Sequence, residues 1–250
     1  MRVATFNILH GRSPADGRVD PGRLAAAVRA LDVDVLALQE VDRDQPRSDR
    51  LDLTAVAREA MGAVDARFVA AMTGEPGTWV GATGQEQPGS AGYGIALLSR
   101  LPVRGWQVVR LPALGFSVPM RFRGARPALV RDEPRVAAVA VVDSPLGELA
   151  VAGTHLSFLP GWNAFQLRRL VRALGRHRGP AVLMGDLNMS TAAARRTTGY
   201  RPLAAGRTFP VEAPRSQIDH VLGRGVSCSR DARTHAFELS DHRALSVELC

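Results

Sequence analysis

Residues 181–190 read AVLMGDLNMS, and the pattern of this stretch recurs along the chain. Residues 181–185 are apolar or glycine, as is typical of a short buried strand. Asp186 and Asn188 follow this strand directly, so a carboxylate and a carboxamide leave the sheet at its edge. Loops at such edges often carry functional side chains. The stretch therefore predicts a polar site at the end of a buried strand.

Other expected strands also carry a carboxylate, a carboxamide or an imidazole at one end. These side chains are Asn7, Glu40, His155, Asp219, Asp241 and His242. Hard oxygen ligands of this kind suit Mg²⁺ or Mn²⁺ and not zinc. A hard cation beside carboxylates and histidines is suited to phosphoester hydrolysis, because the cation neutralises phosphate oxygens while a carboxylate deprotonates water. Imidazoles and amides then donate to the negative charge that develops on the phosphate.

Each of these residues also has an ordinary structural explanation. Asn7 alone is explained as a turn-capping residue, and Asp186 with Asn188 as an Asx-turn. His155 and His242 are explained as structural histidines with satisfied hydrogen bonds. One site accounts for all of them together, whereas the structural explanations must each hold independently.

The hydrophobic pattern predicts strands with few helices between them, which favours mixed β-sheets. Strands are expected at 3–8, 33–39, 66–72, 78–82, 93–99, 103–111, 135–143, 148–155, 181–185, 218–222 and 243–249. Helices are expected at 20–31, where Asp20 and Pro21 form a start signal, at 49–61 and at 161–176. Phe165, Leu170 and Leu174 are expected to form the buried stripe of the third helix. No linker interrupts the pattern, so residues 1–250 are predicted to form a single domain.

Seven motifs carry a resemblance to a known family. In chain order they are TFNILHG, LQEVDR, GYGIALLSR, GTHLSF, GDLNMS, QIDHVL and LSDHRAL. Together they resemble the endonuclease/exonuclease/phosphatase superfamily of deoxyribonuclease I-like metal-dependent phosphohydrolases, over residues 3–249. The resemblance implies an α/β fold, a four-layer α/β sandwich in which two mixed β-sheets face each other. The compact length is similar to that of bacterial members without extra targeting domains.

The resemblance also implies a Mg²⁺-dependent phosphoesterase, with Mn²⁺ as an alternative cation, and gives each matching residue a role. The implied metal ligands are Asn7, Glu40 and Asp241. The implied catalytic residues are His155, Asp186, Asn188, Asp219 and His242. In this scheme Asp186 activates the attacking water, and Asn188 positions that water or binds the phosphate. The two histidines contact the scissile phosphate, one of them aiding departure of the leaving group, and Asp219 orients His242.

Two positions depart from the superfamily's pattern. Tyr93 stands where many relatives carry asparagine, which puts a catalytic role for Tyr93 in doubt. Leu9 stands where AP endonucleases carry an acidic residue, which speaks against that activity. Three residues near the motifs are predicted to bind substrate: His10 and Arg135 through the phosphate, and Trp162 by lining the groove. A solvated surface position for His10 and Arg135 and simple packing for Trp162 are the alternatives.

The charge of the chain favours an anionic partner. It carries 32 Lys+Arg against 24 Asp+Glu, a formal net charge of +8, and every basic residue is arginine. Nucleic acid is favoured by this charge and by arginine as a phosphate-pairing side chain. Only 5% of residues are aromatic, and no basic run is interleaved with aromatics, which speaks against it.

The segment 112–133 favours a different partner, an anionic membrane surface. Phe116, Val118, Pro119, Met120 and Phe122 here adjoin Arg121, Arg123, Arg126 and Arg131. Apolar tips backed by arginine suit the interface of an anionic membrane. The alternative is an ordinary hairpin packed on the sheet edge.

A phosphodiester is the expected substrate, and its alcohol groups are left open. The alternatives are a nuclease acting on DNA or RNA, a sphingomyelinase-like or inositol-phosphate phosphohydrolase, and a non-catalytic module that binds phosphate ligands. No protein partner is predicted. No apolar run approaches the roughly 20 residues of a membrane span, and Met1-Arg2 leads into the first strand without the apolar region of a signal peptide. Cys228 and Cys250 match neither a disulfide framework nor a zinc spacing, so a reducing, cytoplasmic setting is expected.

Overall fold

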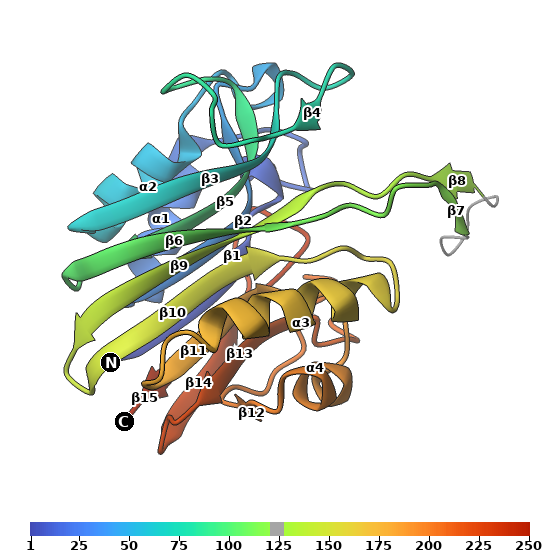
Figure 1. Cartoon of the computed structure of the whole chain (residues 1–250). Helices are drawn as coiled ribbons and strands as arrows, with labels where there is room; N and C mark the ends of the chain where they lie inside the picture. The colour runs from blue at the N-terminus through green and yellow to red at the C-terminus, as the bar shows by residue number, and fades with distance from the viewer. Residues whose placement is uncertain (121–127) are drawn as a thin grey trace.

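In a computed structural model, which describes residues 1–120 and 128–250, two β-sheets pack face to face at the centre of the protein (Figure 1). The first sheet has seven strands in these residues. Side by side they are β14 (Ser229–His235), β15 (Ala244–Leu249), β1 (Arg2–Asn7), β2 (Val35–Arg43), β5 (Gly92–Ser99), β3 (Asp65–Thr73) and β4 (Val80–Gly81). The pair β1 and β2 is parallel and the other pairs are antiparallel, so the sheet is mixed.

The second sheet has six strands in the described residues and is also mixed. Side by side they are β12 (Arg201–Pro202), β13 (Asp219–Arg224), β11 (Ala181–Asp186), β10 (Gly147–His155), β9 (Arg135–Ser144) and β6 (Val103–Leu111). Here only the pair β10 and β11 is parallel. β7 (Val118–Met120) and β8 (Ala128–Val130) pair with each other as a separate hairpin.

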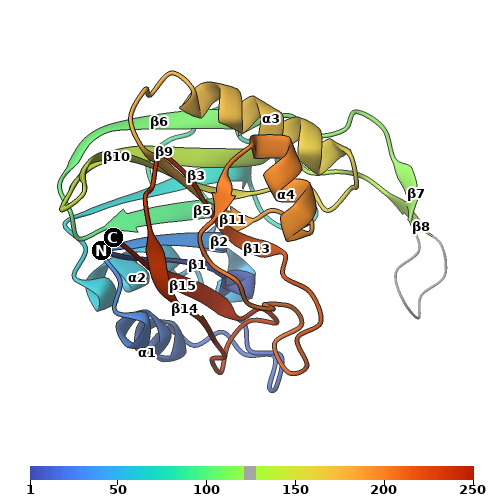
Figure 2. The same cartoon turned by 90° about the horizontal axis from the view of Figure 1, so that it is seen from below.

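Helices cover the outer faces of both sheets (Figures 1 and 2). α1 (Pro21–Leu31) and α2 (Leu53–Met61) lie on the first sheet, and α3 (Trp162–Leu174) and α4 (Thr191–Thr198) lie on the second. Two short 3₁₀ turns, η1 (Leu9–Gly11) and η2 (Pro46–Ser48), follow β1 and β2. Separate buried clusters fill the space between the sheets and under each pair of helices. The predicted four-layer α/β sandwich is therefore confirmed.

The first residues of α1 and α2 show which capping signals in the sequence correctly predict where a helix begins. Asp20 accepts hydrogen bonds from the backbone N–H groups of Gly22 and Arg23, so α1 begins where the sequence predicts. The second helix begins four residues later than predicted. Asp49 adopts the left-handed backbone conformation, and Asp52 caps α2 by accepting from the backbone N–H of Ala55. An aspartate that looks like a cap in the sequence is thus part of a turn that precedes the helix.

Other element predictions need correction. Phe165 is 40% exposed, and Leu167 takes its place beside Leu170 in the buried stripe of α3. The strand predicted at 78–82 is only the two residues of β4. The sequence did not predict α4, β12 or β14. Polar or small residues dominate α4 and β14, so neither shows the apolar periodicity that reveals an element.

Cys228 and Cys250 are joined by a disulfide, with their Cα atoms 5.2 Å apart. The expectation that these two cysteines form no disulfide framework is therefore wrong. Antiparallel pairing places Ser229 opposite Leu249, which brings the residues flanking this pair together. Sequence spacing did not reveal a contact that depends on this register. Within the described part of the chain, the helices lack the length and apolar character needed to cross a bilayer.

The β7–β8 hairpin projects away from the two large sheets (Figure 1). We call residues 112–120 and 128–133 the arm. Phe116 and Leu129 of the arm are 65% and 76% exposed. The buried Asp132 fixes its base by accepting from the backbone N–H of Leu114 (2.9 Å) and from the hydroxyl of Ser157. The arm is thus a separate hairpin and not one packed on the edge of a large sheet. Arg121, Phe122, Arg123 and Arg126 lie outside the described residues.

Candidate active site

Three neighbouring strands of the second sheet, β10, β11 and β13, bring polar side chains to the same end of the sheet. β10 and β11 are parallel and end together, so His155 lies in register with Asp186. β13 runs antiparallel to β11 and begins at the same edge, with Asp219 opposite Asp186. Gly185 is required just before this point, because a Cβ atom there would lie 1.9 Å from the carbonyl oxygen of Thr154. The register of the sheet therefore places the imidazole of His155 between two neighbours. On one side are the carboxylates of Asp186 and Asp219, and on the other is strand β9, which carries Arg135.

The first sheet contributes Asn7 and Glu40 to the same place. Glu40 is the extra residue of a β-bulge opposite β5 and has a left-handed φ of 55°, which takes its side chain out of the strand's alternation. Gly94 lies across from the bulge, where a Cβ atom would meet the carbonyl oxygen of Val69 at 2.0 Å. The Asn7 side-chain amide donates to Glu40 Oε1 (3.0 Å) and to Asp186 Oδ2 (3.1 Å). Asn7 thus links the carboxylates of the two sheets.

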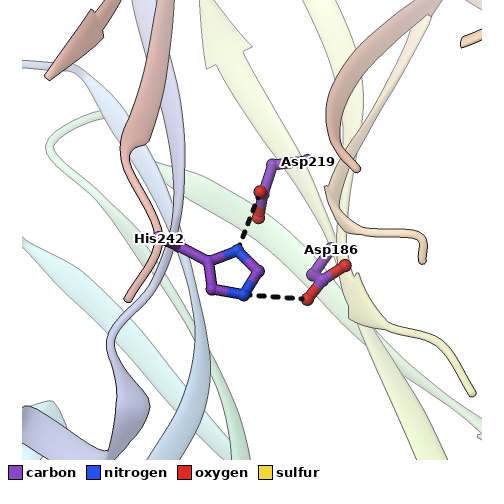
Figure 3. A group of neighbouring side chains, drawn as sticks. All are labelled: Asp186, Asp219 and His242. Atoms are coloured by element: carbon purple, nitrogen blue, oxygen red, sulfur yellow. Dashed lines mark hydrogen bonds and ion pairs between the residues drawn. The ribbon is translucent and has the colours of Figure 1, made fainter. Parts of the chain in front are cut away.

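His242 lies between the two buried aspartates of the second sheet (Figure 3). Its Nδ1–H donates to Asp219 Oδ2 over 2.9 Å, and its Nε2 is 3.8 Å from Asp186 Oδ2. Burial lowers the pKa of the imidazole, but the charge and hydrogen bond of Asp219, together with the charge of Asp186, raise it to about 10. His242 is therefore a buried cation at neutral pH.

Asp186 is the carboxylate on which the other groups converge. Burial, with the neighbouring charge of Asp219, raises its pKa to about 7. Charged His242 and the hydrogen bonds from Asn7 and from the backbone N–H of Asn188 act in the opposite direction. The carboxyl group therefore exchanges its proton near neutral pH in the absence of a metal ion. This is the range in which a general base is effective.

His155 differs from His242 in charge and in tautomer. The guanidinium of Arg135 donates from Nη1 to His155 Nδ1 (3.2 Å). Because Nδ1 accepts this bond, the ring proton is on Nε2, which lies 3.6 Å from Asp186 Oδ2. Burial and the charge of Arg135 hold the pKa of His155 well below its ordinary value. One neutral and one charged imidazole thus present Nε2–H groups to the same carboxylate.

Asn188 is both a turn residue and a member of this group. Its backbone N–H donates to Asp186 Oδ1 (3.0 Å), which is the Asx-turn expected as the structural explanation. Its side-chain amide donates to the carbonyl of Leu156 (3.0 Å) and lies 3.4 Å from His155 Nε2. The turn therefore also delivers the carboxamide beside the two catalytic candidates on β10 and β11.

The donor set fits a hard cation. Burial raises the pKa of Glu40, and the charge of Asp241 adds to this rise. The side-chain amide of Asn7 is shared between Glu40 and Asp186. Burial makes a negative charge on either carboxylate unfavourable, and a divalent cation beside them would offset that cost. Asp186, Asp219 and His242 also offer ligand atoms within 4.8 Å of one another. His242 would have to lose its proton to bind a metal, so Glu40 is the better-suited ligand, with Asp186 close to it through the shared Asn7 amide.

The sequence matches the profile of the Endonuclease/Exonuclease/phosphatase family over residues 4–242, a range that includes Asn7 and His242. The chain belongs to this family. Members of the family are metal-dependent phosphoesterases, so the chain is an enzyme of that class. Among curated proteins, none matches the sequence significantly.

Solved structures with the same fold come from several bacteria. An endonuclease/exonuclease/phosphatase from Beutenbergia cavernae is 25% identical, with a TM-score of 0.66, and the match covers 100% of this chain and 71% of that one. Mannosyl-6-phosphatase Bt3783 from Bacteroides thetaiotaomicron is 19% identical, with a TM-score of 0.63 and coverage of 100% and 99%. Sphingomyelinase C from Streptomyces griseocarneus is 16% identical, with a TM-score of 0.64 and coverage of 99% and 98%. The last two likenesses show the fold alone.

The remaining predicted residues of this family member have other surroundings. Asp241 is partly buried, and its charge acts on both Glu40 and His242. Burial and the charge of Arg47 lower the pKa of His10 to about 4, and the other charged groups that act on it are Asp42 and Arg12. Trp162 donates from Nε1 to the carbonyl of Pro112 (3.1 Å), at the base of the arm. Arg135 contacts His155 directly, whereas the contacts of Trp162 anchor the arm.

Ser240 is a positioning residue that was not predicted. Its hydroxyl donates to the backbone carbonyl of Asn7 (2.6 Å) and accepts from the backbone N–H of His242 (3.0 Å). Its φ of 68° turns the chain at this point. Ser240 thus ties the loop that carries His242 to the end of β1. The signal was present in the motif LSDHRAL, where Ser240 precedes the two polar residues that received attention.

Proposed function

We propose that this protein is a Mg²⁺-dependent phosphodiesterase whose single domain spans residues 1–250. The observation that carries the proposal is the convergence of Glu40, Asp186, His155 and His242 at facing edges of the two sheets. Two carboxylates, one neutral imidazole and one charged imidazole are the groups that metal-assisted attack of water on phosphorus requires. Asn7 and Asp219 hold them in these positions.

Asp186 is the proposed base. Its pKa of about 7 allows it to take a proton from the attacking water, while the water oxygen forms its bond to phosphorus. Asn188, whose backbone is bonded to the same carboxylate, is proposed to orient that water. The leaving oxygen keeps the electron pair as its bond to phosphorus breaks, and it takes a proton from solvent to depart as the alcohol.

The two histidines are proposed to bind the phosphate. His155 is held by Arg135 with its proton on Nε2, so it donates without adding charge. His242 is held protonated by Asp219, so it brings a positive charge to phosphate oxygens as negative charge develops there. Asp219 acts through His242 and is a positioning residue.

The metal site is proposed at Glu40, with Asp241 and Asn7 beside it. A bound Mg²⁺, or Mn²⁺, would neutralise charge on the phosphate and on the leaving oxygen. The Asn7 amide nitrogen faces Glu40 and Asp186, whereas its oxygen accepts from the backbone N–H of Leu9 (3.2 Å). Asn7 therefore supports this site by orienting the carboxylates.

A diester is favoured over a monoester by the charges already paired in the site. Arg135 lies 3.3 Å from Glu133, and His242 is bonded to Asp219. Each buried cation thus has a carboxylate partner, which suits the single negative charge of a diester better than a dianion. The test is hydrolysis of bis-p-nitrophenyl phosphate and of p-nitrophenyl phosphate with Mg²⁺, Mn²⁺ or EDTA. We expect metal-dependent release from the diester. Faster release from the monoester would make the protein a phosphatase, and release from neither would leave a phosphate-binding module.

The alcohol groups have two candidates. Nucleic acid is supported by the net charge of +8. A phospholipid is supported by the arm, whose exposed Phe116 and Leu129 could enter a membrane interface that attracts the nearby arginines.

The cytoplasmic location expected from the sequence stays a prediction. The Cys228–Cys250 disulfide argues against it, because structural disulfides persist mainly in oxidising compartments. Counting free thiols in protein trapped by alkylation in its native cells decides the matter. Two free thiols support the cytoplasm, and none supports an oxidising compartment.

A further inference from the structure

A positively charged site lies away from the proposed active site. It is formed by the edge strand β6, helix α3 and the loop after β4. It is a groove of about 680 Å³. Its arginines are Arg110 on β6 and Arg169, Arg172 and Arg176 on or just after α3. We call this groove the arginine trough. Its volume is within the range of sites that hold ligands.

The sequence of α3 explains why the arginines gather there. Arg169, Arg172 and Arg176 are spaced by three and four residues, so they occupy one side of the helix and the turn that follows it. Leu167, Leu170 and Leu174 lie on the face that packs on the second sheet. The charged side therefore borders the edge of that sheet, where β6 adds Arg110.

Within the described residues, none of these four charges has an acidic partner. Arg110 donates from Nη1 to the carbonyl of Ala70 (3.2 Å), and Arg169 donates from Nε to the carbonyl of Arg110 (3.2 Å). No carboxylate in residues 1–120 or 128–250 forms an ion pair with any of the four arginines. Residues 121–127 contain no Asp or Glu. Four like charges in one groove repel one another, so a bound anion would stabilise them.

The trough extends towards the proposed active site through shared residues. Arg110 and Arg169 also line a second hollow of about 270 Å³, which reaches Arg135. The guanidinium of Arg135 donates to His155, and the void beyond it, of about 10 Å³, is too small to hold part of a ligand. An extended ligand can therefore lie along the trough and the second hollow, with its phosphates on the arginines that line them.

We propose that the arginine trough binds the sugar-phosphate backbone of a nucleic-acid strand. Such a strand supplies evenly repeated phosphates, and guanidinium groups pair with phosphate oxygens in a bidentate way. The residues that line the trough include no aromatic side chain, so the contacts are to phosphates and not to stacked bases. Binding at the trough is therefore independent of base sequence. The proposal rests on the proposed function only in that the bound strand would supply the phosphodiester.

The test measures binding without turnover. A fluorescein-labelled 20-nucleotide single strand is titrated in EDTA, by fluorescence anisotropy, with the wild-type protein and with Arg172→Ser/Arg176→Ser. The double variant is expected to raise Kd about tenfold and to reduce the slope of log K against log salt by about 1.4, since two phosphate contacts are lost. The matched control is Arg195→Ser/Arg196→Ser, which removes two exposed arginines of α4 outside the trough.

Equal Kd values for the wild type and the trough variant would overturn the proposal. An equal loss in the control variant would also overturn it, because the effect would then follow net charge alone. Co-sedimentation with phosphatidylglycerol-containing vesicles provides the third comparison. A trough variant that loses vesicle binding but keeps oligonucleotide binding would assign the trough to a lipid surface. These outcomes do not depend on catalysis, whereas hydrolysis of bis-p-nitrophenyl phosphate by the wild type tests the proposed function, so the two can fail separately.

Discussion

Two regions, the arm and the cluster formed by Asn7, Glu40, Asp186, Asp219, His155 and His242, differ in how deeply their side chains are buried and in how many contacts fix them. In the cluster, Asn7, Asp186 and His242 are buried, and each is held by at least one neighbour from a different strand or loop. In the arm, Phe116 and Leu129 are mostly exposed, and the fixed contacts lie at the base. The strand register of the two sheets fixes the positions of the cluster's side chains, whereas a few hydrogen bonds at its base fix the position of the arm. Changes in the cluster should therefore affect chemistry and stability strongly, and changes in the arm should affect neither unless a partner is present.

The largest effect is expected where the cluster holds its charged imidazole. Asp219→Asn and His242→Ala should each lower kcat for bis-p-nitrophenyl phosphate by about a hundredfold or more, since each removes the same oriented cation. The double variant should be little worse than either single one, because the two residues act as a unit. Steady-state rates of the four proteins give this cycle. Widely different single effects that add in the double variant would break the pairing of Asp219 with His242.

The next effect concerns the metal. Glu40→Gln keeps the size of the side chain but removes its charge, so it should raise the Mg²⁺ concentration for half-maximal activity about tenfold. A titration of activity with Mg²⁺ measures this shift. The exposed Glu238→Gln serves as the control, because Glu238 is not a neighbour of the cluster. An unchanged titration for Glu40→Gln would move the metal ligand elsewhere.

The buried His242 and Asp186 should make the stability of the protein depend on pH. The folded pKa of His242, about 10, is above its unfolded value, so its contribution is fully present below about 6.5 and is lost as pH rises towards 10. The folded pKa of Asp186, about 7, is also raised, so its protonated form stabilises the fold at low pH and this contribution is lost as pH rises through 7. Both groups therefore predict that the metal-free protein loses thermal stability between pH 5 and pH 9.

Thermal unfolding in EDTA at pH 5, 7 and 9 measures this loss. Asp186→Asn should flatten the profile up to pH 7, and His242→Ala should flatten it above that pH. Mg²⁺ should raise the unfolding midpoint most at pH 9, where the carboxylates are ionised. A wild-type midpoint that rises from pH 5 to pH 9 without metal would contradict the assigned protonation states.

The smallest effect is expected in the arm. Phe116→Ser/Leu129→Ser should change the free energy of unfolding by less than about 0.5 kcal/mol, because both side chains are already exposed. If the substrate is a phospholipid, the same variant should lose co-sedimentation with phosphatidylglycerol-containing vesicles. A large loss of stability would show that the arm packs on the body of the protein. Unchanged vesicle binding would remove the arm from the lipid candidate.

The sequence predicted the parts of the site that depend on local pattern. Asp186 and His155 were found because each follows an apolar run directly, and the alternation of a strand fixes where the next side chain points. The four-layer fold followed from the family resemblance, and the family profile and the packing of the two sheets confirm it. The roles of the individual site residues stay predictions until the variants above are measured.

What the sequence did not predict depends on long-range register. The Cys228–Cys250 disulfide follows from the pairing of β14 with β15, and the position of Ser240 follows from a bond to Asn7 far along the chain. The arginine trough joins β6 to α3, two elements separated by about fifty residues, as shown by the bond from Arg169 to Arg110. Periodicity within a window of residues contains no information about such contacts.

Asp186 is proposed to activate water for metal-dependent attack on a phosphodiester. The most direct measurement is release of p-nitrophenol from bis-p-nitrophenyl phosphate by the wild type, by Asp186→Asn and by the exposed control Asp231→Asn, each with Mg²⁺ and with EDTA. The wild type and the control are expected to release p-nitrophenol with Mg²⁺ only, and Asp186→Asn, with its fold intact, at a rate at least about a thousandfold lower. Wild-type rates for Asp186→Asn, or full activity in EDTA, would contradict this proposal.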